Sequence, residues 1–184
     1  GPTPMALRRD AMQVSARIMQ EVVACALRHQ PHGRGTVGMV QVFPNSRNVI
    51  PGRVKFSIDL RNSTDALVDQ MADEVMAFAA KAATESGLAV TIEMVSSYPA
   101  QAFHEDCKGA VQRAAQKLGY SNMPAVSGAG HDAVYMARLA PSGMIFIPCL
   151  NGISHNEIED AKPEHITAGC NVLLHAMLER AGGV

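Results

Sequence analysis

Residues 53–95 have the sequence RVKFSIDLRNSTDALVDQMADEVMAFAAKAATESGLAVTIEMV, and this stretch decides the fold. Apolar and polar residues alternate over 53–61, which is typical of a half-buried strand. A helix is predicted to begin after Ser63 or Thr64 and to end at Gly87, because apolar residues then recur at helical spacing. Five residues of this helix are predicted to face inward: Leu67, Met71, Val75, Phe78 and Ala82.

The segments on either side extend this pattern into a layered unit. Residues 5–28 predict a long amphipathic helix that ends near Gly33, and 36–43 predict a strand that forms a hairpin with 53–61. Residues 88–95 predict a third strand. The order of helix, strand, strand, helix and strand is that of a ferredoxin-like βαββαβ unit that lacks its first strand. Five residues recur at helical spacing along the first helix: Met5, Met12, Ile18, Val22 and Cys25.

The sequence changes character after residue 97, where helices and short strands are predicted to alternate. This alternation indicates α/β layering, so we predict one domain over 1–97 and a second over 98–184. The fold class is therefore α+β followed by α/β. The predicted elements of the second domain are a helix over 105–118, a short strand near Ala125, a short helix from Asp132, a buried strand over 144–148 and a last helix over 163–180.

Composition and charge restrict the partners of this 184-residue chain. Hydrophobic residues make up 47% of it, which is enough for a real core, and the net charge is −1 without a basic run. Nucleic acid is therefore not an expected partner. The longest apolar stretches are far shorter than the roughly 20 residues of a membrane span. No targeting peptide is visible, so a cytoplasmic location is expected.

The cysteines and most histidines carry no recognisable metal pattern. The four cysteines are widely spaced and form no CxxC pair, so reduced, partly buried thiols are expected. Five histidines lie in or beside predicted helices without partners at metal spacing, and we interpret them as structural or exposed: His29, His32, His104, His165 and His175.

Two loops in the second domain could carry chemistry. The segment ISHNEIED, residues 153–160, follows a predicted buried strand and brings His155 and three acids together, although two of those acids could equally cap the next helix. The segment SGAGHDA, residues 127–133, has glycines that allow close backbone approach, and His131 could donate to a developing oxyanion. A glycine-rich turn with a surface histidine is the alternative for this second loop.

A third candidate lies in the first domain, where Asn48 and Arg61 flank a predicted strand. Arginine grips a carboxylate through two parallel hydrogen bonds, and a nearby amide adds orientation. The pair could therefore clamp a substrate carboxylate. Alternatively, Arg61 forms an ordinary surface ion pair with Asp59, which lies two residues earlier on the same face of the strand.

Four segments, in this order, resemble the amidase and hydantoinase/carbamoylase branch of the zinc aminopeptidase-like hydrolases: GPTPMALRRDA, the pair NVIPG and DLR, SGAGHDA, and SHNEIE. The branch includes N-carbamoyl-L-amino acid hydrolases, allantoate amidohydrolases and β-ureidopropionases. The resemblance implies a catalytic domain with two divalent metal ions, zinc or alternatively manganese or nickel, interrupted by a ferredoxin-like lid that forms a homodimer.

The resemblance also implies roles for individual residues. His155 would be a metal ligand, and His131 would contact the substrate amide. Asn48 and Arg61 would hold the substrate carboxylate from the lid, with Gly130 offering its backbone. A metal-bound hydroxide would then attack the carbamoyl carbon of an N-carbamoyl amino acid and release ammonia, carbon dioxide and the amino acid.

The resemblance places the other metal ligands and the first strand of the lid before Gly1, so this chain is expected to be a C-terminal fragment that lacks the N-terminal catalytic half. One ligand cannot fix a metal, so the chain alone is expected to bind none and to show no turnover. The sequence does not choose among carbamoyl amino acids, allantoate and β-ureidopropionate. A non-catalytic module for dimerisation and substrate binding is the competing hypothesis for the chain itself.

Overall fold

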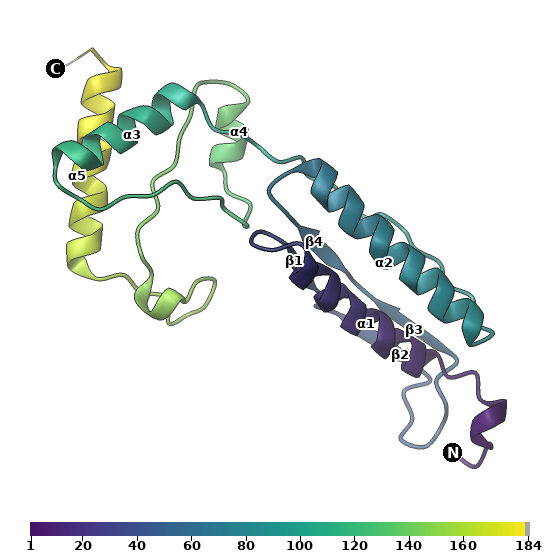
Figure 1. Ribbon diagram of the computed structural model, residues 1–184. Coiled ribbons are helices and arrows are strands. Elements are labelled where there is room, and N and C mark those ends of the chain that lie inside the picture. The colour runs from purple at the N-terminus through teal and green to yellow at the C-terminus, as the bar shows by residue number, and fades with distance from the viewer. Residues whose placement is uncertain (183–184) are drawn as a thin grey trace. The chain divides into compact units, whose positions relative to one another are not determined.

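The computed structural model describes residues 1–182, which form two compact units, residues 1–100 and residues 101–182 (Figure 1). This division lies close to the predicted boundary between residues 97 and 98. The elements in chain order are η1 Met5–Leu7, α1 Ala11–Arg28, β1 Arg34–Thr36, β2 Val40–Phe43, β3 Arg53–Phe56, β4 Asp59–Arg61, α2 Asp65–Glu85, α3 Glu105–Lys117, α4 Ala133–Ala137, η2 Leu150–Gly152 and α5 Pro163–Arg180.

The first long helix, α1, is shorter than predicted and begins at Ala11. Asp10 has an extended backbone, and its side chain accepts hydrogen bonds from the N–H groups of Met12 and Gln13 at 3.0 and 3.3 Å. This N-cap satisfies donors that a continuous helix would otherwise bond internally, so the helix cannot extend towards Met5. Met5 and Met12 are exposed, whereas the other three residues on the predicted apolar side are buried.

The strands form a narrow antiparallel ribbon in which β1 pairs with β4 and β2 pairs with β3. The predicted strand over 36–43 is therefore two short strands with an irregular link between them. The opposite side of the hairpin, residues 53–61, is also interrupted, between β3 and β4. There the N–H of Ser57 donates to the carbonyl of Met39 at 3.1 Å. The predicted alternation of exposed and half-buried residues over 53–61 is confirmed.

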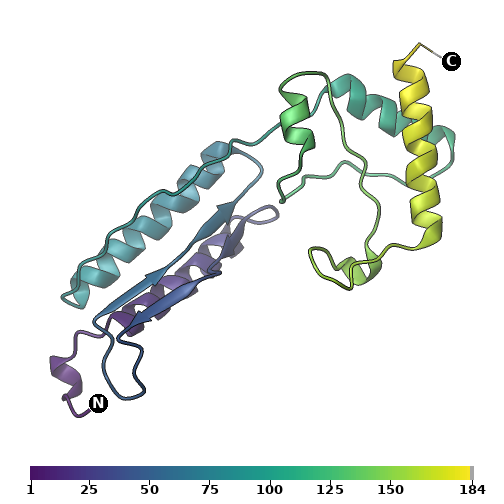
Figure 2. The same ribbon diagram turned by 180° about the vertical axis from the view of Figure 1, so that it is seen from behind.

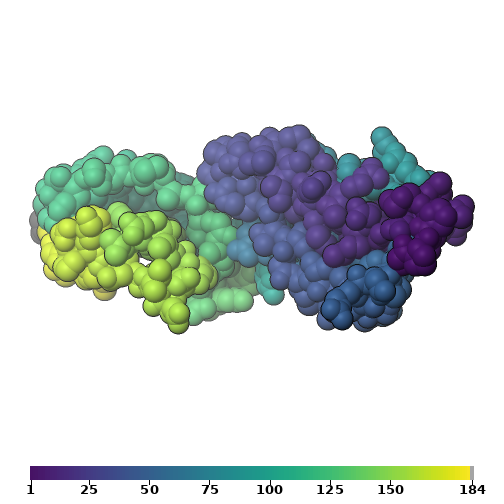
Figure 3. Space-filling model, turned by 90° about the horizontal axis from the view of Figure 1, so that it is seen from below, coloured from purple at the N-terminus to yellow at the C-terminus, as the bar shows by residue number. Residues whose placement is uncertain are grey.

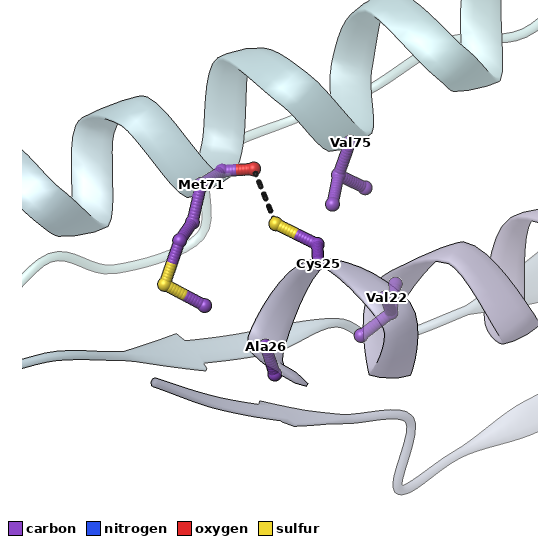
Figure 4. Close-up of a cluster of buried hydrophobic side chains, with 5 residues drawn as sticks. All are labelled: Val22, Cys25, Ala26, Met71 and Val75. Carbon is purple, nitrogen blue, oxygen red and sulfur yellow. Dashed lines mark hydrogen bonds between the residues drawn. The ribbon is translucent and has the colours of Figure 1, made fainter. Parts of the chain in front are cut away.

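The helices α1 and α2 lie side by side and cover one face of the ribbon (Figure 2). The Thr64 side chain caps α2 by accepting from the N–H of Leu67 at 3.3 Å, as the sequence predicts. The largest fully buried side chains lie between the two helices: Met71, Val22 and Cys25. The Cys25 thiol points at the Met71 carbonyl, 3.7 Å away (Figure 4).

The predicted strand over 88–95 is wrong, because this segment pairs with no other strand among residues 1–182. The extended chain from 88 to 100 runs beside α2, with Leu88 N–H donating to the Ala83 carbonyl at 2.9 Å and Ala100 N–H donating to Asp65 at 2.7 Å. A strand requires a hydrogen-bonded neighbour.

The second unit has helices but no strand within the described residues 101–182. The helices α3 and α5 pack together around small side chains, and the buried residues of this core are Ala110, Ala114, Ala115, Val172 and Ala176. The predicted strands near Ala125 and over 144–148 are wrong, because neither segment has a strand beside it among residues 1–182. The second segment instead packs against helices, through Ile145 on the core and Ile147 on Gly169 of α5. None of the helices within residues 1–182 is both long and apolar enough to cross a membrane.

Candidate functional site

Arg61 is the last residue of β4, and a carboxylate holds its guanidinium group. Its Nε and Nη2 atoms donate to the two oxygens of Asp59 at 2.8 and 3.0 Å. Both side chains are half exposed. The hydrogen bonds from Arg61 lower the pKa of Asp59, so Asp59 is ionised at neutral pH. The alternative expected from the sequence, a surface ion pair between Arg61 and Asp59, is therefore present. It fixes the direction in which Arg61 points.

Asn48 lies in the loop between β2 and β3, at the opposite end of the ribbon from Arg61. The strand segment from Arg53 to Arg61 alone spans roughly 26 Å at 3.3 Å per residue. The loop lies next to the N-terminal segment, where the N–H of Ala11 donates to the Pro51 carbonyl at 3.1 Å (Figure 3). The structure therefore does not bring Asn48 and Arg61 together within one chain.

His131 lies at the start of the short helix α4, and its ring orientation is set by the backbone. Its Nδ1 atom accepts a hydrogen bond from the N–H of Ala133 at 3.0 Å, and its carbonyl accepts from Val134 at 3.0 Å. Because Nδ1 is an acceptor, a neutral imidazole must carry its proton on Nε2. The exposed Nε2–H is then a donor for a substrate oxygen. Asp132, which the sequence predicts as the N-cap, makes no such bond with its side chain.

Gly130 precedes His131 in an exposed loop. A Cβ atom added at Gly130 would meet no other heavy atom within 4 Å. Packing within this chain therefore does not require glycine at this position. Room beside the backbone is what close approach of a ligand would need.

His155 is held in an unusual backbone conformation by an acid four residues later. Its φ is 56°, in the left-handed region that side chains rarely adopt, and its N–H donates to Glu159 Oε2 at 2.8 Å. The N–H of Leu150 donates to the Asp160 carbonyl at 2.7 Å and closes the loop. Glu159 therefore orders this loop, and neither acid caps α5, whose N-cap is Lys162. The position of Glu159 in the sequence gave no sign of this role.

Within residues 1–182, His155 does not lie in any group of three metal-ligating side chains. The loop acids close to it in sequence are exposed, and Glu159 accepts a hydrogen bond from the backbone N–H of His155, not from its ring. Thus the described residues do not form a two-metal centre, and His155 can supply one ligand at most.

One group of metal-ligating side chains does occur, in the first unit, and sequence reasoning missed it. Cys25 and His29 on α1 and Glu74 on α2 place their ligand atoms within 4.8 Å of one another. His29 was interpreted as having no partner at metal spacing, but Cys25 lies four residues earlier, which is the same face of a helix. That spacing was the available signal, and only packing shows that Glu74 joins it.

Comparison with known proteins first shows the protein family to which the chain belongs. The sequence profile of Peptidase family M20/M25/M40 matches residues 10–179, and the chain therefore belongs to this family. The resemblance found in the sequence is confirmed at this level. The mixed α/β structure with small sheets agrees with the family fold.

Similar proteins place the chain within a branch of that family. It is 44% identical over 181 residues to an N-carbamoyl-L-amino-acid amidohydrolase from Rhizobium meliloti, covering 98% of this chain and 44% of that relative. It is 31% identical over 181 residues to an allantoate amidohydrolase from Bacillus subtilis strain 168, covering 98% and 44%. A solved amidase of the hydantoinase/carbamoylase family from Burkholderia multivorans matches with a TM-score of 0.93 and 52% identity, covering 98% and 44%. The chain thus spans about 44% of the length of these relatives.

Proposed function

We propose that the whole protein containing these residues hydrolyses a linear amide C–N bond in an N-carbamoyl amino acid. The observation that carries this proposal is the geometry of His131, whose fixed Nδ1 acceptor leaves Nε2–H to donate to the carbamoyl oxygen. The relative with 44% identity is named for this substrate class, whereas the allantoate relative is 31% identical. We therefore propose carbamoyl amino acids, rather than allantoate, as the substrate class.

Arg61 supplies the recognition of the substrate α-carboxylate. Its planar guanidinium group matches a carboxylate, and its bidentate contact with Asp59 removes much of the rotamer freedom that binding would otherwise cost. Asp59 is then a positioning residue for Arg61. In this proposal Gly130 and His131 contact the carbamoyl group.

Asn48 can join this site only from a second copy of the chain, since the ribbon separates it from Arg61 within one copy. The predicted homodimer thus becomes a requirement of the proposed carboxylate clamp. Sedimentation of the whole protein tests it. A strictly monomeric enzyme with full activity would exclude Asn48 from the clamp.

The two metal ions implied by the resemblance do not fit the residues present here, because one histidine cannot hold a metal pair. His155 would supply a single ligand, and the others must come from residues outside this chain. No step of the reaction is assigned to the metals on the basis of this structure. What this chain supplies is carboxylate binding by Arg61 and hydrogen-bond donation by His131.

The test is ammonia release from an N-carbamoyl-L-amino acid by the whole protein, with His131→Ala and His104→Ala compared. The two histidines are matched, because each accepts a backbone N–H two residues later through Nδ1 at the start of a helix. We expect His131→Ala to lower kcat by roughly 10²–10³-fold with little change in KM, as for the loss of one oxyanion donor. His104→Ala should retain activity. Equal losses in both variants would show that His131 acts only as a helix cap.

A further inference from the structure

We infer that Cys25, His29 and Glu74 form a binding site for one divalent transition-metal ion, best suited to zinc, that fastens the end of α1 to the middle of α2. The three ligand atoms lie within 4.8 Å of one another and come from two helices. A thiolate, an imidazole and a carboxylate are a ligand set that zinc accepts, with water in the fourth position. The site shares no residue with Asn48, Arg61, His131 or His155, so it stands independently of the proposed function.

The ligand atoms of Cys25, His29 and Glu74 already lie close to one another. Glu74 Oε1 is 2.9 Å from His29 Nε2, and Glu74 Oε2 is 3.6 Å from Cys25 Sγ. Cys25 is fully buried, and the His29 side chain is 9% exposed, whereas Glu74 is 32% exposed and leaves a route to solvent. The backbone N–H of His29 bonds to the Cys25 carbonyl at 3.2 Å, so the last turn of α1 fixes the two ligands relative to each other.

The charges around the site also suit a divalent cation. The ionisable groups acting on the Cys25 thiol are Glu74, Arg28 and Glu21. Arg28 donates to Glu21 at 2.6 Å and to Glu74 at 2.9 Å. With Cys25 as a thiolate and His29 neutral, three negative groups and one positive group leave a net charge of −2. A bound divalent ion would neutralise it.

Without metal, the same groups satisfy one another, so the site needs no ion to be folded. The thiol of Cys25 points at the Met71 carbonyl and at Glu74, and Gln70 also donates to Glu74 at 3.3 Å. Metal binding releases the thiol proton of Cys25 to solvent, and the His29 proton that Nε2 shares with Glu74 moves to Nδ1, so that Nε2 can bind the metal. No electron transfer takes place. The proposed site departs from the expectation that the chain alone binds no metal.

The experiment is titration of the metal-free 184-residue chain with Co²⁺ at pH 8, followed by competition with Zn²⁺. Cobalt bound by a thiolate in a tetrahedral site gives strong charge-transfer absorption. We expect this absorption to saturate at one equivalent, to be lost in Cys25→Ser and to be displaced by zinc. His29→Gln and Glu74→Gln should each weaken binding by at least about tenfold.

Two further variants give the controls. Cys149→Ser alters a thiol of the second unit and should leave the titration unchanged. Arg28→Gln removes a cation that competes for Glu74, so it should bind cobalt several-fold more tightly than the unaltered chain. An ordinary ion-pair network would not show such a gain.

Zinc should also raise the Tm of the unaltered chain but not that of Cys25→Ser, because a ligand that binds only the folded state stabilises it. Circular dichroism shows whether each variant is folded, and if Cys25→Ser is not, the His29→Gln and Arg28→Gln results decide the question. Absence of thiolate absorption, or an absorption that persists in Cys25→Ser or disappears in Cys149→Ser, would overturn the inference.

Discussion

The two units of the chain differ in whether their extended segments find partners. In Gly1–Ala100 two hairpin segments pair, although 88–95 does not, and two helices cover the hairpin with Met71 and Val22 fully buried. In the second unit, no extended segment within residues 101–182 pairs, and the core consists mainly of alanines. Several large apolar residues of α5 are correspondingly exposed: Ile166, Leu173, Leu174, Met177 and Leu178. The difference teaches that apolar patterning makes a strand only where the chain also provides its neighbour.

The largest expected effect contrasts two methionines on helices. Met71→Ala removes a fully buried side chain from the first core and should lower the free energy of unfolding of that unit by about 2–5 kcal/mol. Met177→Ala on α5 removes a mostly exposed one and should change stability by no more than about 0.5 kcal/mol. Urea unfolding followed by circular dichroism measures both. Similar losses in the two variants would break the contrast between the units.

The next contrast uses two glycines. A Cβ atom at Gly35 would lie 2.6 Å from the Val22 carbonyl oxygen of α1, whereas one at Gly130 would meet nothing within 4 Å. Gly35→Ala should therefore destabilise the first unit by about 1–3 kcal/mol through overpacking, and Gly130→Ala should be nearly neutral. Thermal unfolding of each variant provides the test. A stabilised Gly35→Ala chain would contradict the close packing of β1 on α1.

Acid should weaken the first unit through Glu74. Hydrogen bonds from Arg28 and His29 lower the pKa of Glu74 from 4.5 to about 2. Because the folded-state pKa is the lower one, this contribution is complete above about pH 4.5 and is lost as the pH falls towards 2. Glu74→Gln should flatten the pH dependence of unfolding over that window. Glu179→Gln, which removes the exposed ion pair with Arg113 in the second unit, should flatten it less.

The smallest effect on stability is expected at Asp59. Because its ion pair with Arg61 is half exposed, Asp59→Asn should cost no more than about 1 kcal/mol. In the whole protein the same change should raise KM for the carboxylate substrate, since Arg61 loses the group that orients it. Urea unfolding and steady-state kinetics on one preparation separate the two effects. A large stability loss without a change in KM would make Asp59 structural only.

The helices could be predicted from the sequence because their signals are local. Thr64 as the N-cap of α2, Gly87 after its end and Pro163 at the start of α5 all occur where the pattern places them. The start of α1 was misjudged because the cap at Asp10 lies inside a segment with continuous helical spacing. The strands over 88–95 and 144–148 failed because pairing is non-local, and residue patterns do not show whether a partner exists.

In the candidate site, too, local contacts could be predicted from the sequence and non-local contacts could not. Sequence spacing identified Arg61 and its partner Asp59, which lie two residues apart on one strand. It did not show how far apart Asn48 and Arg61 lie, because the extended segment 53–61 carries Arg61 along the ribbon, away from the loop that contains Asn48. It also missed the contact between His29 and Glu74, since that contact joins two helices. The roles of His131 and His155 remain predictions that rest on the resemblance.

The central proposal is that, in the whole protein, Arg61 recognises the substrate carboxylate and His131 acts on the carbamoyl group. The most direct measurement compares kcat/KM of the whole protein for an N-carbamoyl-L-amino acid and for its α-carboxamide, in Arg61→Ala and His131→Ala. We predict that Arg61→Ala greatly reduces activity on the acid but barely changes activity on the carboxamide, while His131→Ala reduces both equally. An Arg61→Ala variant that loses activity equally on both substrates would contradict the claim.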